Sequence, residues 1–171
     1  DQDLETIYWT IIGACSAAKK SIRIVTPYFI PEQGLKHAIM TAALQGIEVR
    51  LVLPEATDNR VVSWATRAYL WELIQAGVTV IQTPPPFDHS KLVIVDGRWV
   101  LFGSANLDPR SLRLNFEYNM EAYDPALCAT LESHFDALEQ QGTKVTLKDV
   151  DGRSMLVRLR DGAAKLFSPY L

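Results

Sequence analysis

The chain has 171 residues, enough for one domain with a sizeable hydrophobic core. Apolar residues make up 48% of it and charged residues 22%, which are ordinary values for a globular protein. The net charge of −3 and the pI near 5.6 argue against a general nucleic-acid-binding protein, because such proteins usually carry a basic excess. The charge is uneven: residues 142–171 hold six Lys/Arg and three Asp, whereas residues 1–141 hold eleven Lys/Arg and seventeen Asp/Glu. The C-terminal tail is therefore the basic part.

The pattern of apolar residues predicts helices that alternate with short strands. Gly46 and Gly77 mark helix ends, and Asp58 is expected to cap the helix that follows it. Asp96-Gly97 is typical of a hairpin turn. In chain order, the predicted elements are a helix over 3–19, a strand over 21–26, a helix over 33–45, a strand over 49–53, a helix over 58–76, strands over 78–82, 91–95, 99–102 and 116–123, and helices over 125–140 and 153–167.

This alternation predicts an α/β layered domain with a mixed, mostly parallel sheet and helices on both faces. We expect residues 1–171 to form a single domain, with 142–171 as a basic C-terminal extension. Cys15 and Cys128 fall in apolar helical patterns and are expected to be buried free thiols, and neither a metal site nor a cofactor is expected. We expect no signal peptide and no membrane span, since no stretch approaches ~20 apolar residues. The chain starts at Asp1 and enters a helical pattern at once, so we expect it to be part of a longer protein.

The run His89-Ser90-Lys91 places an imidazole and an ammonium two residues apart. In a strand such residues project from the same face, and Val93 and Val95 continue that face into the core. The motif therefore lies at the beginning of a strand, where the core ends and a cleft can open. Histidine can attack a phosphodiester without a metal, while a lysine stabilises the phosphate charge.

Three further segments complete the pattern. Asp96 lies at the far end of the same strand, and we interpret it as a turn and packing residue. After the next strand, Gly103 allows close backbone approach to a ligand, and Ser104 and Asn106 offer donors to phosphate oxygens. Glu117 opens the following strand, where its carboxylate would accept the histidine Nδ1–H and leave Nε2 to attack. Each piece alone has a simpler interpretation as a strand end, a loop or a surface acid. Their order and context together favour a site for phosphodiester chemistry.

These residues resemble the signature of the phospholipase D superfamily, which is His-x-Lys-x4-Asp, then Gly-Ser-x-Asn, then a downstream acid. More narrowly, the chain resembles the C-terminal half of bacterial cardiolipin synthases. The resemblance covers most of residues 20–171. The segments that carry it are TPYFIP (26–31), GSANLDPRS (103–111), LNFE (114–117) and LFSP (166–169).

The resemblance implies a phospholipase D-like fold and a phosphohistidine formed by His89 with a phosphatidyl group. Lys91, Ser104 and Asn106 would hold the phosphate oxygens, and Glu117 would orient the histidine. The expected reaction is phosphatidyl transfer, which joins two phosphatidylglycerols and releases glycerol. One alternative is hydrolysis of phospholipid, and another is cleavage of nucleic acid by a homodimeric phosphodiesterase, which the acidic charge disfavours. A non-enzymatic interaction domain is a further alternative, against which the intact motif argues.

The catalytic unit of this superfamily contains two such motifs, and this chain has one. His37 and His134 do not begin a second copy, because Ile39 and Asp136 stand two positions later. We therefore expect a partner, which is either a second phospholipase D-like half or a symmetric homodimer mate. A single half does not reveal which histidine of the pair attacks the phosphorus. His89 is therefore either the nucleophile or the general acid.

A phospholipid substrate implies contact with a membrane surface. The implied location is the bacterial inner membrane, reached through regions outside this chain or by peripheral contact. The loop Tyr28-Phe29 and the aromatic helix 60–76 are candidates for this contact, although core packing is the alternative for both. The basic tail suits anionic lipid, and its alternative is a helix that closes the domain with solvated charges. The tail residues concerned are Arg153, Arg158, Arg160 and Lys165, with Leu156, Leu159, Leu166 and Phe167. The predicted helix over 153–167 has Leu156, Val157, Leu159, Ala163 and Leu166 as its apolar members.

Overall fold

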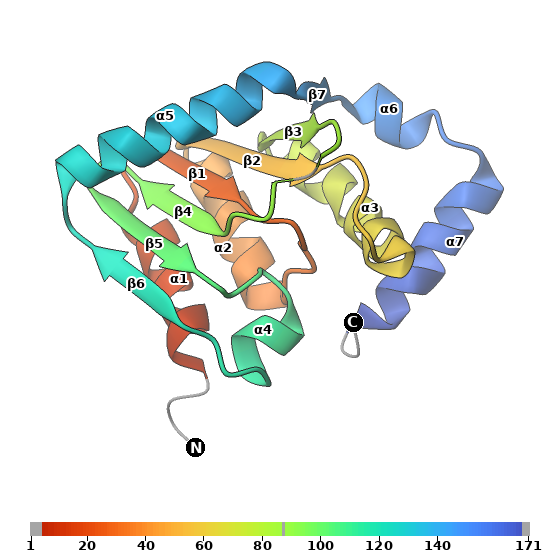
Figure 1. The fold of residues 1–171 in the computed structure, drawn as a ribbon. Helices are drawn as coiled ribbons and strands as arrows, with labels where there is room; N and C mark the ends of the chain where they lie inside the picture. Colours follow the sequence, from red (N-terminus) through yellow and green to blue (C-terminus); the bar gives the residue numbers. More distant parts are fainter. Residues whose placement is uncertain (1–4, 87, 169–171) are drawn as a thin grey trace.

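The computed structural model describes residues 5–86 and 88–168, which are arranged around a seven-stranded sheet (Figure 1). The order of strands across the sheet is β6-β5-β4-β1-β2-β3-β7. The strands are β1 (Ser21–Val25), β2 (Glu48–Pro54), β3 (Thr79–Thr83), β4 (Leu92–Val95), β5 (Trp99–Gly103), β6 (Asn119–Ala122) and β7 (Thr143–Val145).

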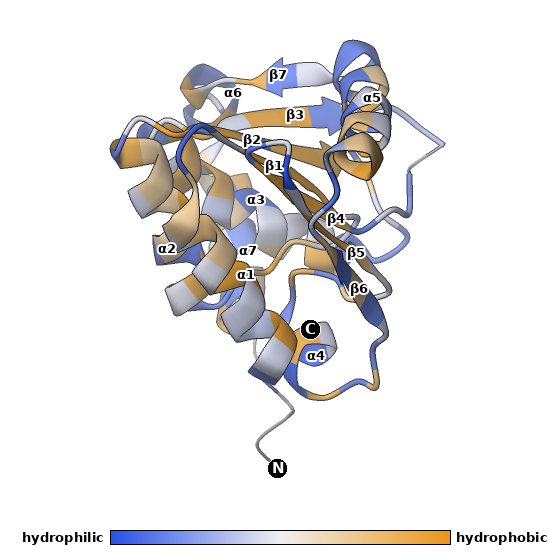
Figure 2. Ribbon diagram, turned by 90° about the vertical axis from the view of Figure 1, so that its left-hand side faces the viewer, coloured by the Kyte–Doolittle hydropathy of each residue, from blue (hydrophilic) through white to orange (hydrophobic). Residues whose placement is uncertain are grey.

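Helices cover both faces of the sheet, so the predicted mixed α/β architecture is confirmed. The helices are α1 (Thr6–Ala17), α2 (Gln33–Leu44), α3 (Arg60–Gln75), α4 (Pro109–Arg113), α5 (Pro125–Gln141), α6 (Leu147–Asp151) and α7 (Met155–Leu166). The first three lie on one face and α5 crosses the other (Figures 1 and 2). α7 packs along α3 at the edge of the fold.

Alternate residues of each central strand face two separate cores. In β4, Val93 and Val95 join the core beneath α1, α2 and α3, as the sequence predicts. Leu92 and Ile94 join the second core, beneath α5. β4 is buried along its whole length, which explains its continuous run of apolar residues.

The predicted dominance of parallel pairing is wrong. Among neighbouring strands of the described chain, β1–β2 and β2–β3 are parallel and the other four pairs are antiparallel. Parallel neighbours need a crossover, and α2 and α3 supply one for each parallel pair. Asp96 and Gly97 have φ angles of 56° and 63°, and they close β4 and β5 into a hairpin. The antiparallel pairing brings the N-terminal end of β4 to the same sheet edge as the C-terminal ends of β1 and β5.

The helix predicted over 58–76 begins two residues later than expected. Asn59 is its N-cap, and the Asn59 side chain accepts hydrogen bonds from the N–H groups of Val61 and Val62 at 3.1 and 3.2 Å. The predicted cap, Asp58, instead accepts a hydrogen bond from the hydroxyl of Tyr28.

Other predicted boundaries also shift. His89, Ser90 and Lys91 precede β4, and Glu117 precedes β6, so the motif side chains lie in loops at the strand ends. α4, α6 and β7 were not predicted, because helices of little more than one turn and a strand of three residues are too short to show an apolar period. The first two residues of the predicted helix 3–19 and the motif residue Pro169 lie outside the described residues.

The basic C-terminal segment is built into the fold. β7 adds an antiparallel edge strand to β3, and α7 packs on α3. The buried residues of α7 are Asp161 and Ala164, whereas Leu156, Leu159 and Leu166 are exposed. A helix that simply closes a domain would present the opposite face to the solvent.

The prediction about the two cysteines is confirmed. Cys15 and Cys128 are free and buried, and burial raises the pKa of the Cys15 thiol to about 12. Within residues 5–86 and 88–168, every helix is too short or too polar to cross a bilayer.

Candidate functional site

The predicted site residues gather at one edge of the sheet. His89 and Lys91 stand where β4 begins, Ser104 and Asn106 follow the end of β5, and Glu117 lies just before β6. These segments meet because β5 runs antiparallel to both β4 and β6.

Lys91 is held against His89. Its Nζ lies 2.9 Å from Nδ1 and 3.2 Å from Nε2 of the imidazole, and it donates to the His89 carbonyl oxygen at 2.7 Å. Lys91 is only 9% exposed. Burial lowers the pKa of Lys91, while the carboxylates of Glu117, Asp88 and Asp108 act in the opposite direction. The arrangement holds the Lys91 ammonium beside the His89 ring, and the three carboxylates favour its charged form.

Glu117 is tied to the loop after β5. Its carboxylate accepts hydrogen bonds from the Ser104 hydroxyl and from the Asn115 side-chain amide, the latter at 3.3 Å. The Ser104 oxygen also accepts the N–H of Tyr118 at 2.9 Å. The Ser104 hydroxyl thus positions Glu117 in this structure, and its role as a phosphate donor stays a prediction.

Two asparagines present unsatisfied polar atoms at the site. The Asn106 amide donates to the Ser111 hydroxyl at 3.3 Å, while its buried Oδ1 has no hydrogen-bond partner among the described residues. The Asn119 Oδ1 accepts the N–H of Ala105 at 3.4 Å, while its buried Nδ2 likewise has no partner there. Buried polar atoms without partners are costly and are typical of functional sites. Sequence reasoning missed Asn119, although an amide two residues after Glu117 on the same strand pattern was a usable signal.

Tyr28 forms another wall of the site. Its ring meets the His89 ring edge-on, with centroids 6.3 Å apart. Burial and the hydrogen bond to Asp58 raise the pKa of Tyr28 to about 12. Its neighbour Phe29 is fully buried and belongs to the core, so the core-packing alternative is correct for Phe29. A cavity of about 240 Å³ adjoins Tyr28 and is lined by Asp58, Asn59, Val62, Asn106, Asp108, Arg110, Ser111 and Asn115.

Asp108 is the N-cap of α4. Its side chain accepts the N–H of Ser111 at 2.7 Å. Burial raises the pKa of Asp108, although hydrogen bonds from Ser111 and Arg110 act to lower it. A buried carboxyl with a raised pKa on the wall of a cavity is a candidate for substrate contact.

Asp96 and Gly103 make contacts with the scaffold. The Asp96 carboxylate accepts the backbone N–H groups of Lys19, Lys20 and Ser21 at 2.9, 2.7 and 2.9 Å. A Cβ on Gly103 would lie 2.2 Å from the carbonyl oxygen that precedes β6. Glycine was predicted to admit a ligand here, but the close approach that it allows is that of the neighbouring chain segment.

Behind the motif, His134 of α5 lies near both neighbours of His89. Its Nε2 is 3.4 Å from the Ser90 hydroxyl and 3.7 Å from an Asp88 carboxylate oxygen. Asp88 also accepts the Ser90 N–H at 2.7 Å. These contacts anchor the loop that carries His89 to α5.

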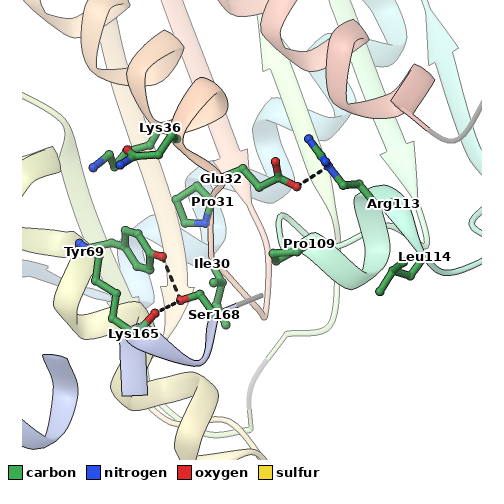
Figure 3. A pocket seen from close by; sticks show the side chains of 11 residues that line it. Ile30, Pro31, Glu32, Lys36, Tyr69, Pro109, Arg113, Leu114, Lys165 and Ser168 are labelled. Carbon is green, nitrogen blue, oxygen red and sulfur yellow. Dashed lines mark hydrogen bonds and ion pairs between the residues drawn. The ribbon is translucent and has the colours of Figure 1, made fainter. Parts of the chain in front are cut away.

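A larger cavity, of about 550 Å³, lies between α2, α3, α4 and the end of α7 (Figure 3). Lys36, which is 4% exposed, pairs with Glu72, and Glu72 also accepts a hydrogen bond from Lys165 at 3.0 Å. Across the cavity, Glu32 pairs with Arg113 at 2.7 Å. The remaining lining residues are Ile30, Pro31, Gln33, Tyr69, Pro109, Leu114 and Ser168.

Comparison with known proteins identifies the family. A family profile described as "Cardiolipin synthase, PLD-like domain" matches residues 11–139. The chain belongs to this cardiolipin synthase family of phospholipase D-like domains. A cardiolipin synthase of Oceanobacillus iheyensis is 40% identical over 171 residues, and the major cardiolipin synthase ClsA of Bacillus subtilis is 38% identical. Each match covers 100% of this chain and 36% of the relative, so this cardiolipin synthase-type domain spans about a third of those proteins.

Solved structures agree with the family fold. The phospholipase D family member Nuc of Salmonella typhimurium superimposes with a TM-score of 0.73 at 24% identity, covering 82% of this chain and 91% of Nuc. A phosphatidylserine synthase of Haemophilus influenzae gives 0.78 at 22% identity, covering 96% of this chain and 45% of that protein. These likenesses establish the phospholipase D-like fold.

Proposed function

We propose that this domain carries out phosphatidyl transfer of the cardiolipin synthase type, condensing two phosphatidylglycerols with release of glycerol. The observation that carries the proposal is the buried Lys91 ammonium held 2.9 Å from the His89 ring at the sheet edge. Such a pair supplies a nucleophile and a charge-stabilising cation in one place. Membership of the cardiolipin synthase family supports the choice of phospholipid as substrate.

In the proposed reaction, the His89 Nε2 attacks the phosphorus of one phosphatidylglycerol. The bond from phosphorus to the glycerol headgroup breaks, and the departing glycerol oxygen takes a proton from a general acid. A hydroxyl of a second phosphatidylglycerol then attacks the phosphohistidine and gives its proton to the same group. Cardiolipin forms and the imidazole is restored.

We assign the remaining roles from the contacts described above. Lys91 would neutralise the phosphate oxygens, and Asn106 would orient them through its Nδ2, which donates to Ser111 in this structure. Asn119 is added as a donor because its Nδ2 lacks a partner among the described residues. Glu117 would hold the His89 tautomer, with Ser104 positioning Glu117 and sharing in phosphate binding. Asp96 and Gly103 would support the site without touching substrate.

We further propose that residues 1–171 act as one catalytic domain that needs a partner. The general acid would come from a second phospholipase D-like half or from a symmetric copy of this chain, since His37 and His134 lack the accompanying lysine. If the histidine of the other half attacks the phosphorus, His89 would be the general acid. The proposed substrate would bring the protein to the bacterial inner membrane, through other regions or by peripheral contact.

The test uses the complete gene product with phosphatidylglycerol vesicles, and follows cardiolipin and glycerol. His89→Gln should abolish both products, while His37→Gln, an exposed histidine of α2, should leave them unchanged. Glycerol with phosphatidic acid, but without cardiolipin, would identify a hydrolase instead. Cardiolipin formation at the wild-type rate by His89→Gln would overturn the proposal.

A further inference from the structure

The outer side of α7 is an exposed apolar stripe. Met155, Leu156, Leu159, Leu166 and Phe167 are 75%, 79%, 58%, 79% and 60% exposed. At 100° per residue, their positions fall within one arc of about 120° along α7 and its C-cap. Soluble monomers rarely expose a contiguous row of large apolar side chains, and such rows mark protein or membrane contact sites.

The polar side of α7 is the side that packs on the protein. Asp161, which is 2% exposed, accepts hydrogen bonds from Arg153 and Arg160, and Lys165 donates to Glu72 of α3. The bonds to Asp161 lie within the α7 segment, whereas the Lys165–Glu72 bond ties α7 to α3 and fixes the rotation of the helix about its axis. The stripe therefore faces outward because the side of α7 that carries Asp161, Ala164 and Lys165 packs on the protein.

Two arginines border the stripe. Arg158 lies on one side of the apolar arc and is 56% exposed, with Asp151 as a partner at 3.8 Å. Arg160 lies on the other side, stacked over the Trp64 ring at 4.4 Å. Cationic borders on an apolar arc are characteristic of helices that lie in the plane of a bilayer surface. A second copy of the same face would bring like charges together.

We propose that α7 docks this domain on an anionic phospholipid bilayer, with the stripe among the acyl chains and Arg158 at the headgroups. The choice of an anionic phospholipid rests on the proposed function. The exposed stripe and its arginine borders do not depend on that function. Lys165 and Ser168, at the end of α7, also line the cavity of about 550 Å³, so docking would set the rim of that cavity at the membrane.

The test compares the chain with its Leu156→Ser/Leu159→Ser/Leu166→Ser variant by co-sedimentation with vesicles of mixed phosphatidylglycerol and phosphatidylcholine. Because all three leucines are exposed, circular dichroism melting should be unchanged. Apparent vesicle affinity should fall about tenfold or more, since the inserted apolar area is lost. Leu44→Ser, which alters a 72% exposed leucine on α2, is the matched control and should bind like the wild type.

Several results would overturn the proposal. They are absence of wild-type binding, equal binding by the triple variant, and an equal loss in Leu44→Ser. A wild-type dimer that the triple variant dissociates, without vesicle binding, would assign the stripe to a second copy. His89→Gln should bind vesicles normally, so a failure of docking is distinguishable from a failure of the proposed catalysis.

Discussion

Replacing Asp96 should separate a structural role from a chemical one. Its carboxylate joins the β4–β5 hairpin to the turn between α1 and β1 through three backbone N–H groups. Asp96→Gly removes all three hydrogen bonds. The relief of left-handed strain at φ 56° and the added entropy of unfolded glycine are each about 1 kcal/mol and offset one another. At about 1 kcal/mol for each hydrogen bond, the free energy of unfolding should fall by about 3 kcal/mol.

Asp96→Asn is the matched variant. Its remaining oxygen would keep the bonds from Lys20 and Ser21, which share Oδ1, and lose the bond from Lys19. We therefore expect a loss of about 1 kcal/mol at pH 7 in urea denaturation, and normal turnover of the folded variant. Equal stability of the Gly and Asn variants, or a Gly variant as stable as wild type, would refute this reasoning.

The pH dependence gives a second check on Asp96. Burial acts to raise its pKa, but the N–H groups of Ser21, Lys19 and Lys20 prevail, and the folded pKa lies below the ordinary value of 3.8. The contribution of the charge is therefore complete above pH 3.8 and is lost as the pH falls through the folded value. The stability difference between wild type and Asp96→Asn should shrink in that acidic range.

Three further predictions concern packing and charge. Gly103→Ala should lower the free energy of unfolding by about 1–3 kcal/mol, because the added Cβ would lie 2.2 Å from a backbone oxygen. Gly13→Ala is the control: it has open space around it and should raise the melting temperature slightly. Glu72→Gln should cost about 3 kcal/mol at pH 7 by leaving the buried Lys36 without a charged partner. Because its hydrogen bonds hold the pKa of Glu72 below 4.5 despite burial, this difference should diminish as the pH falls through the folded pKa. Cys15 should resist thiol reagents until the chain unfolds, and reaction of the native protein would contradict its pKa of about 12.

The sequence predicted most of the helices and strands well, since their apolar patterns are local. Helices α2, α3 and α5 and the strands β1 to β5 lie within a few residues of their predicted bounds. Strand order was not accessible, because the pairing of β1 with β4 depends on contacts between distant segments. The cap of α3 was misplaced because Asp58 and Asn59 are both good caps, and only the hydroxyl of Tyr28 decides between them.

The motif predicted which residues would assemble, but only part of how they would be used. The proximity of His89 to Lys91 follows from their spacing. The bond of Ser104 to Glu117 does not, because it depends on the loop geometry that connects β5 to β6. Asn119 was missed although its position two residues after Glu117 was a usable signal, because its buried Nδ2 without a partner becomes evident only in the structure.

The central place of β1 in the sheet has a consequence for biosynthesis. β1 pairs with β2 through a local crossover. Its other edge pairs with β4, with Ile22 opposite Val95, and β4 comes much later in the chain. As the chain leaves the ribosome, the β1-α2-β2-α3-β3 unit would form first, with an unpaired apolar edge. We expect that edge to be the main route to aggregation of nascent chains. The β4–β5 hairpin closes it, and the same event delivers His89 to the sheet edge, so the vulnerable stage ends as the site is assembled.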